Sequence, residues 1–186
     1  MRIRRRIVAA IVAVCVAVPV LQGMQGGPTA ISPIARVDAA PIDEMSGIVK
    51  SARFRDVYWI HNDSGDQPRF FAIQADGKAV IPSGMRADAY QGIAVVNAKN
   101  SDWEDIARDR DTLYLSDMGN NGNARRDLGV YAIKEPDPRR TTEVRGTFLP
   151  IAYPDQKDFP PSGLRAFDCE AIFALRGKLY FVTKHR

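Results

Sequence analysis

Residues 102–107 of this 186-residue chain read DWEDIA, and two further segments begin with the same acidic-then-apolar pattern. These segments are EMSGIV at 44–49 and DCEAIF at 168–173. A tyrosine follows Glu104 and Glu170 by ten residues and Glu44 by fourteen, each time within an aromatic, strand-like run. The pattern indicates an internal repeat of β-rich units. Chance similarity among β-rich segments is the alternative.

Short apolar runs rich in β-branched and aromatic residues lie between clusters of Gly, Asp and Asn from Asp43 onward. Their lengths and boundaries predict β-strands. The runs are 57–60, 69–73, 92–96, 113–115, 129–133 and 179–182. Asp76-Gly77 predicts a tight hairpin turn through positive φ angles, and Arg176-Gly177 gives a weaker signal of the same kind. Residues 101–108 fit either a helical turn or a short strand, so the sequence predicts an all-β fold without a long amphipathic helix.

A unit of four short strands per repeat favours a β-propeller over a sandwich, because four strands form one propeller blade. Glu44, Glu104 and Glu170 are 60 and 66 residues apart, which exceeds a blade of about 40–50 residues. A loop such as 135–163 accounts for the excess. We therefore expect a partial β-propeller of about three repeats over residues 43–186.

A partial propeller has open strand edges, since closure takes about four to eight blades. We expect the chain to be a truncated product. Pairing with a second copy and a wrong blade count are the two alternatives.

The N-terminus has the order of regions of a secretory signal peptide. A charged MRIRRR precedes an apolar run at 7–21 that is too short for a comfortable bilayer span, which needs about 20 residues. We expect residues 1–27 to be a signal peptide, with an uncleaved anchor as the alternative, and residues 28–42 to be a leader into the fold. The sequence thus predicts an extracytoplasmic protein, periplasmic or secreted.

The charge balance argues against nucleic-acid binding, and the cysteine count excludes an intrachain disulfide and a zinc site of Cys and His type. Four of the 26 basic residues lie in the first six positions, and the remaining 22 balance 22 acidic residues. A nucleic-acid partner is therefore not expected, since phosphate binding needs uncompensated basic clusters. Cys15 belongs to the predicted signal peptide, which leaves Cys169 alone in the body. An intrachain disulfide and a zinc site of Cys and His type are both excluded on count.

Acidic and amide residues gather where repeats begin and where strands end, and such runs offer the hard oxygen ligands that calcium prefers. Carboxylates from the first strand of each repeat would converge on a common axis, where they repel one another unless a cation joins them. The alternative interpretation is that Asp, Asn and Gly are present only because they form turns. The candidate metal ligands are Glu44, Asn62, Asp63, Glu104, Asp117, Asn120 and Glu170. The weak candidates for a catalytic role are Glu104 and Glu170.

Several segments, in the same order along the chain, resemble secreted and mostly uncharacterised bacterial β-propeller proteins of the phytase-like or esterase-like type. The matching segments are WIHNDSGD at 59–66, DWEDIA at 102–107, SDMGNN at 116–121, YAI at 131–133, YPD at 153–155, DCEA at 168–171 and LYFVTK at 179–184. The resemblance implies bound cations, or a site at the mouth of a channel, near Asp63, Glu104, Asp117 and Glu170. It implies no particular activity, because propellers carry many functions on one scaffold.

Two hypotheses for function follow. The first is a non-catalytic extracytoplasmic domain that binds a small-molecule or protein ligand, with calcium as a candidate cofactor. The second is a calcium-dependent hydrolase of phosphoesters, esters or lactones, in which the metal polarises the substrate and a carboxylate activates water. Glu104 and Glu170 are the candidates for ligand or base in the second.

Overall fold

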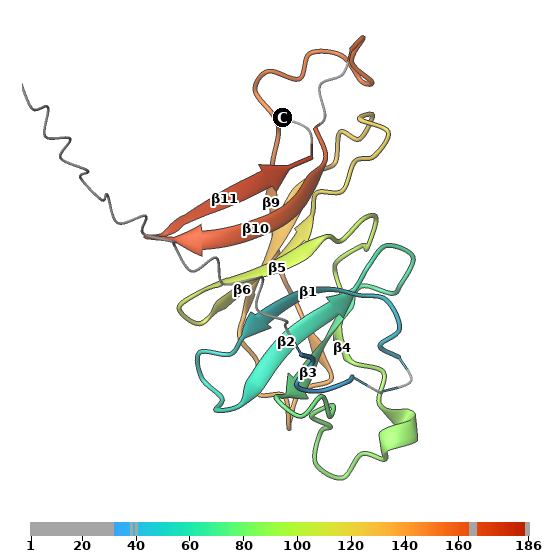
Figure 1. Ribbon diagram of the computed structural model, residues 1–186, viewed down its shortest axis with the longest axis vertical. Helices are drawn as coiled ribbons and strands as arrows, with labels where there is room; N and C mark the ends of the chain where they lie inside the picture. Colours follow the sequence, from blue (N-terminus) through green and yellow to red (C-terminus); the bar gives the residue numbers. More distant parts are fainter. Residues whose placement is uncertain (1–31, 38, 40, 164–166, 185–186) are drawn as a thin grey trace, which may run out of the picture. The chain divides into compact units, whose positions relative to one another are not determined.

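The computed structural model describes residues 32–37, 39, 41–163 and 167–184 (Figure 1). Contacts divide the chain into two units, Met1–Ser32 and Pro33–Arg186, and the strands of the described residues belong to the second. The predicted signal peptide lies outside the described residues. In the part of the chain that the structure describes, no helix has the length and apolar character that crossing a bilayer requires.

The described chain is all-β, as predicted, and its strands form three sheets, none of which closes on itself. The first sheet has the order β1-β2-β3-β4-β8, with antiparallel neighbours except for β8, which runs parallel to β4. Its strands are β1 (Met45–Lys50), β2 (Val57–Asn62), β3 (Arg69–Gln74), β4 (Ile93–Val95) and β8 (Glu143–Val144). A single 3-10 turn, η1 (Ala87–Ala89), lies between β3 and β4.

The second sheet is fully antiparallel, in the order β5-β6-β7-β9. Its strands are β5 (Asp105–Asp109), β6 (Thr112–Asp117), β7 (Gly129–Lys134) and β9 (Thr147–Pro150). The third is a hairpin of β10 (Cys169–Leu175) and β11 (Lys178–Thr183). The three repeat starts are therefore at β1, β5 and β10, the first strand of each sheet.

Two details differ from the sequence prediction. Residues 135–163, expected as a loop, contain β8 and β9, and β9 completes the second sheet. The four residues of β9 are all exposed, so the strand lacks the alternation that would identify it. Arg176-Gly177, with φ of 52° and 74°, gives the regular two-residue hairpin. The prediction for Asp76-Gly77 is wrong in its type, because only Gly77 has a positive φ, of 84°, and only an isolated bridge at Ala79 follows.

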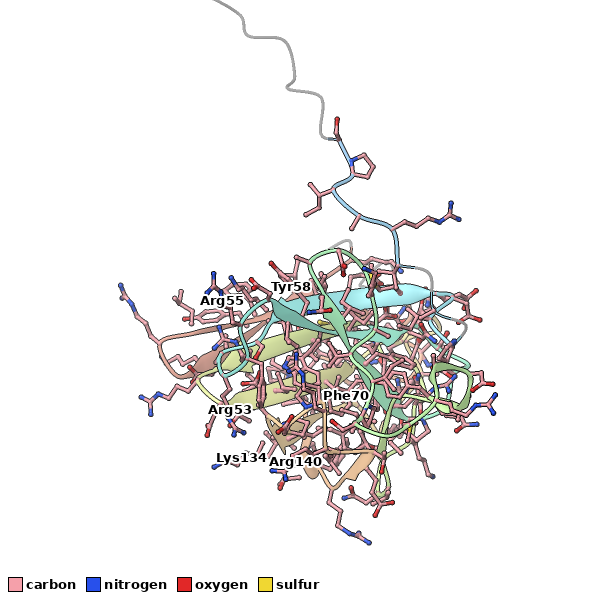
Figure 2. The ribbon with its side chains drawn as sticks, turned by 90° about the horizontal axis from the view of Figure 1, so that it is seen from below. Arg53, Arg55, Tyr58, Phe70, Lys134 and Arg140 are labelled. Carbon is pink, nitrogen blue, oxygen red and sulfur yellow. The ribbon has the colours of Figure 1, made fainter. Side chains whose placement is uncertain are left out.

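Alternate side chains of each sheet pack on opposite sides, as a strand period of two requires. Trp59 and Phe70 face the second sheet and share a core with Trp103. Their neighbours Ile60 and Phe71 face the opposite way, into a cluster that includes leader residues near Ile42. A further core joins the second sheet to the hairpin, with members including Met118, Val130 and Ile172. Figure 2 shows Phe70 among the packed side chains and Arg55 projecting from them.

Consecutive sheets also meet through their first strands, since β1 contacts β5 and β5 contacts β10. The Ser46 hydroxyl donates to the Glu104 carbonyl at 2.7 Å, and the Ile172 N–H donates to the Asp105 carboxylate at 2.8 Å. Gly47 makes the first approach possible, because a Cβ there would lie 2.7 Å from the Ile106 nitrogen. The three repeat starts are thereby brought side by side.

Candidate functional site

Five carboxylates meet where the repeat starts lie together. Asp63 follows β2, and its N–H donates to the Glu44 carbonyl at 2.9 Å. Asp102 and Glu104 precede β5 and are fixed through N–H donation to the Asp117 carboxylate and the Ser116 carbonyl, each at 3.0 Å.

The hairpin supplies the other two carboxylates. Asp168 immediately precedes β10, and its buried carboxylate accepts the Asn120 N–H at 2.6 Å. Glu170 is the second residue of β10.

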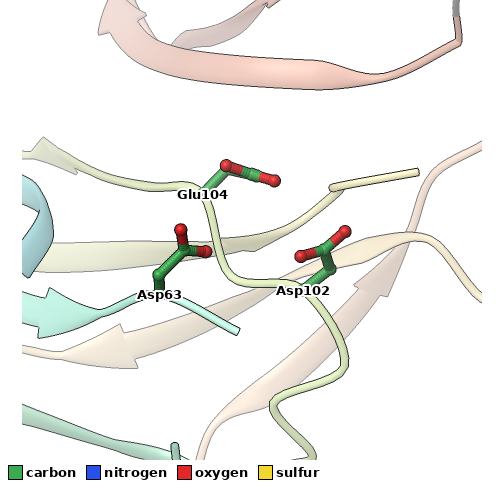
Figure 3. Close-up of side chains that lie close together, drawn as sticks. All are labelled: Asp63, Asp102 and Glu104. Carbon is green, nitrogen blue, oxygen red and sulfur yellow. The ribbon is translucent and has the colours of Figure 1, made fainter. Parts of the chain in front are cut away.

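The five groups form two overlapping clusters. One consists of Asp63, Asp102 and Glu104, and the other of Glu104, Asp168 and Glu170. Within each cluster one carboxylate oxygen per residue lies within 4.8 Å of the others. Figure 3 shows the first cluster, in which the side chains come from two separate segments of the chain. Glu104 belongs to both clusters and is therefore the centre of the arrangement.

Gly119 gives these carboxylates their space. A Cβ at this position would lie less than 3.0 Å from both the Asp102 carboxylate and a Glu104 carboxylate oxygen. Only a residue without a side chain allows the backbone to approach so closely. The backbone of Gly119 therefore forms one wall of the cluster, which fixes the two carboxylates next to each other.

Burial and mutual repulsion perturb the acids of the site. Burial, followed by the charge of Glu170 and then of Asp102, raises the pKa of Glu104 to about 8. Burial also raises the pKa of Asp102, although the Arg125 guanidinium opposes the change. Concentrated negative charge without full compensation is the condition that a bound cation relieves.

Lys184 partly compensates the second cluster. Its ammonium lies 2.5 Å from a Glu170 carboxylate oxygen and 3.3 Å from Asp168, and the bond to Glu170 is the main reason that its pKa is raised. In the first cluster, by contrast, Glu104 and Asp63 make no ion pair with any basic side chain of the described residues. The first cluster is thus the better candidate for an added cation.

Three of the predicted metal ligands, Asp63, Glu104 and Glu170, lie in the clusters. The side chains of Asp117 and Asn120 make other contacts. Asp117 pairs with Arg125 at 3.0 Å, and the Asn120 amide donates to the Phe167 carbonyl at 3.0 Å and accepts from the Arg125 N–H. Both hold the loop beneath the clusters in place.

The other two predicted ligands lie at a neighbouring pocket. Asn62 donates to the Pro41 carbonyl and to the carboxylates of Asp43 and Asp66, at 2.7, 3.1 and 2.9 Å. Together with Glu44 it lines a polar cavity of about 450 Å³. Neither residue belongs to the carboxylate clusters found among the described residues.

Asp102 and Asp168 are the site residues that sequence reasoning missed. Both stand two positions before a predicted glutamate ligand, in the repeated pattern Asp-x-Glu at 102–104 and 168–170. The signal was therefore present in the repeat itself. Asp102 and Asp168 belong to the site because the second and third repeat starts both contact the loop that contains Gly119 and Asn120.

Two further residues with reactive side chains are enclosed. His61 is fully buried against the edge of Trp103 at a ring-centroid distance of 5.9 Å, and burial lowers its pKa. Burial raises the pKa of the Cys169 thiol to about 12. A thiol with such a pKa stays protonated and unreactive at neutral pH.

No family model, no curated protein and no solved structure matches this chain.

Proposed function

We propose that this protein is an extracytoplasmic domain of β-propeller type that binds calcium between Asp63, Asp102 and Glu104 and uses the ion to hold a ligand. The observation that carries the proposal is the position of Glu104, which is shared by two carboxylate clusters where the first strands of successive sheets meet.

Two features support the propeller arrangement. The second sheet is a four-stranded antiparallel meander, interrupted along the chain only by the short β8, which pairs with β4, and the first four strands of the first sheet have the same order. Successive sheets pack face to face and touch through their first strands. These are the relations between neighbouring blades of a propeller.

The donor set fits calcium. All three side chains supply carboxylate oxygens, which are hard ligands, and calcium takes about 6–8 oxygens in flexible geometry. Asp63 lies in a loop directly after β2, and Asp102 lies in the segment that leads into β5, outside the hydrogen-bonded strands. The close wall at Gly119 brings the carboxylates of Asp102 and Glu104 together before any ion is bound.

A bound calcium ion would polarise an oxygen of the ligand as a Lewis acid. The protein would contribute the remaining selectivity through the groups around it. Lys184, already paired with Glu170 and Asp168, places a positive charge beside the site. An anionic or oxygen-rich ligand is the class that an ammonium and a calcium ion attract together.

A second candidate function is calcium-dependent hydrolysis of phosphoesters, esters or lactones. The specific observation in its favour is that burial and the neighbouring carboxylates raise the pKa of Glu104 to about 8, which suits proton transfer near neutral pH when the other carboxylates of the clusters hold the ion. In this alternative Glu104 accepts a proton from the attacking water. Chromogenic phosphomonoester, ester and lactone substrates test it. Turnover that disappears in Glu104→Gln, with the fold retained, would favour the hydrolase over the binding domain.

Thermal unfolding tests the calcium proposal directly. A ligand that binds only the native state raises the melting temperature by mass action. We expect calcium to raise the transition and a chelator to reverse the change, with magnesium less effective because it demands a stricter octahedral geometry. A transition that calcium leaves in place would refute the proposal.

A further inference from the structure

Among the residues that the structure describes, none covers one of the two faces of the hairpin β10–β11. Ile172 and Phe181 on one side pack against the second sheet. Phe173 and Tyr180 on the other side stack on each other at 4.9 Å, and they are 45% and 40% exposed. Leu175 and Val182 extend this face and are about half exposed as well. We name the four residues Phe173, Leu175, Tyr180 and Val182 the trailing face. The trailing face exposes four large apolar side chains next to one another, and such patches mark interaction sites in soluble proteins.

The corresponding faces of the first and second sheets are covered by the sheet that follows each of them. Strand pairing makes Phe173 the counterpart of Val49 in β1 and of Ala107 in β5. Val49 packs in the core that contains Ile106 of the following sheet, and Ala107 packs in the core that contains Ile172 of the hairpin. In both cases the cover is an isoleucine of the next sheet's first strand.

The opposite end of the succession of sheets offers the matching isoleucine. Ile48 in β1 occupies the register position of Ile106 and Ile172, which are only 2% and 5% exposed. Ile48 itself is 52% exposed, because no sheet of the described chain precedes β1. In Figure 1 the hairpin and β1 lie on opposite sides of the second sheet.

A mainly apolar pocket accompanies Ile48. It has a volume of about 240 Å³, and its walls include Val37, Met45, Tyr58 and Ile73. We name Ile48 and these four residues the leading face. A cavity of this size accepts one or two large side chains, and the trailing face carries the stacked Phe173 and Tyr180.

We propose that the trailing face of one chain packs on the leading face of a second copy of this chain. At Ile48 the contact repeats, between molecules, the packing of an isoleucine on the preceding sheet that the chain makes twice within itself, whereas leader residues around Ile42 already cover the neighbouring Ile60. Two copies related by a twofold axis make this contact twice, the trailing face of each on the leading face of the other, and so close into a ring of two. Closure covers both apolar faces of each chain.

The test uses the 186-residue chain, expressed with its N-terminal segment and purified in the form that the cells yield. Its mass is measured by light scattering and sedimentation equilibrium. We expect twice the mass of the recovered chain. A wild-type protein with the mass of a single chain across a wide range of concentrations would overturn the proposal.

Charged substitutions identify the faces. Phe173→Lys on the trailing face and Ile48→Glu on the leading face should each halve the mass, because each variant spoils both contacts of the ring. Val96→Glu is the matched control: Val96 is 46% exposed but belongs to neither face, and this variant should keep the double mass. Emission from the buried Trp59 and Trp103 shows that each variant is folded.

Mixing the two charged variants separates this contact from any other mode of dimerisation. In a mixed pair, one contact sets the new ammonium of Phe173→Lys against the new carboxylate of Ile48→Glu, and the other joins the two unchanged faces. We expect the equimolar mixture to recover the double mass. Failure to recover it, with both variants folded, would show that Phe173 and Ile48 do not meet across an interface.

Discussion

Glu104→Gln should change the stability of the protein in opposite directions without and with calcium. Glu104 lies within 4.8 Å of two carboxylates in each cluster. Two unit charges at this distance repel by about 1 kcal/mol at the dielectric constant of water and by about 3.5 kcal/mol at an effective value of 20. The site is partly exposed, so the lower figure applies to each pair. Lys184 compensates Glu170 and Asp168, so the repulsion from Asp63 and Asp102 remains, and removing the charge of Glu104 should stabilise the calcium-free protein by about 1–2 kcal/mol.

The size of this stabilisation depends on pH. The pKa of Glu104 is about 8 in the folded protein and near 4.5 when unfolded, so the native state holds an extra proton between these values. Its stability then falls as pH rises from about 4.5 to about 8. The advantage of Glu104→Gln should be largest at pH 9, where Glu104 is ionised in both states, and small at pH 5. A gain of 1–2 kcal/mol corresponds to a melting temperature about 2–8 °C higher for a domain of this size.

Calcium should reverse the order. At a concentration a hundred times the dissociation constant, calcium stabilises the wild type by about 2.7 kcal/mol. That corresponds to a rise of about 5–11 °C. The variant loses one of three carboxylate ligands and should gain little. Melts at pH 9, with calcium and with chelator, measure both effects, and Glu44→Gln is the matched control because Glu44 lies outside the clusters. A calcium-free Glu104→Gln less stable than the wild type, or one with an undiminished calcium response, would refute the reasoning.

Three further predictions concern the backbone beside the site, the pH dependence of calcium binding and a hydrogen bond in the core. Gly119→Ala places a methyl group less than 3.0 Å from the carboxylates, so it should cost about 1–3 kcal/mol in urea unfolding and weaken calcium binding. Gly122→Ala, which meets nothing within 4 Å, should do neither, and equal losses would contradict the steric argument. Calorimetric calcium affinity should increase between pH 7 and pH 9, since the ion displaces the proton of Glu104; an affinity independent of pH would argue against Glu104 as a ligand. Glu135→Ala removes the acceptor, at 2.7 Å, of the buried Trp59 N–H and should cost about 1–3 kcal/mol, which an unchanged urea midpoint would disprove.

Most strands could be predicted from the sequence because their pattern depends on short-range chemistry. Each apolar run identified in the sequence corresponds to a strand, and the repeat starts became the first strands of their sheets. A strand in a half-buried sheet must alternate its side chains and end at turn residues, and both features are local. The strand β9 escaped detection for the same reason, since its exposed residues carry no alternation.

The candidate site was only partly readable. The sequence pointed to Asp63, Glu104 and Glu170, because the repeat placed acids near strand ends. It could not separate them from Asp117, whose identical chemistry is directed to Arg125. Which acid faces a partner and which faces another acid depends on the packing of segments that lie far apart in the sequence.

The sequence by itself determined the all-β class, the positions of the strands other than β8 and β9, and the three-part repeat, since these follow from the period of the side chains and the conformations of turn residues. The tertiary structure decided which carboxylates meet, which of them Lys184 compensates and how strongly Glu104 holds its proton, because charge interaction depends on distance and burial in space. It also decided that Ile106 and Ile172 are covered while Ile48 is open. Identical residues in one repeated pattern differ only in whether a sheet precedes them.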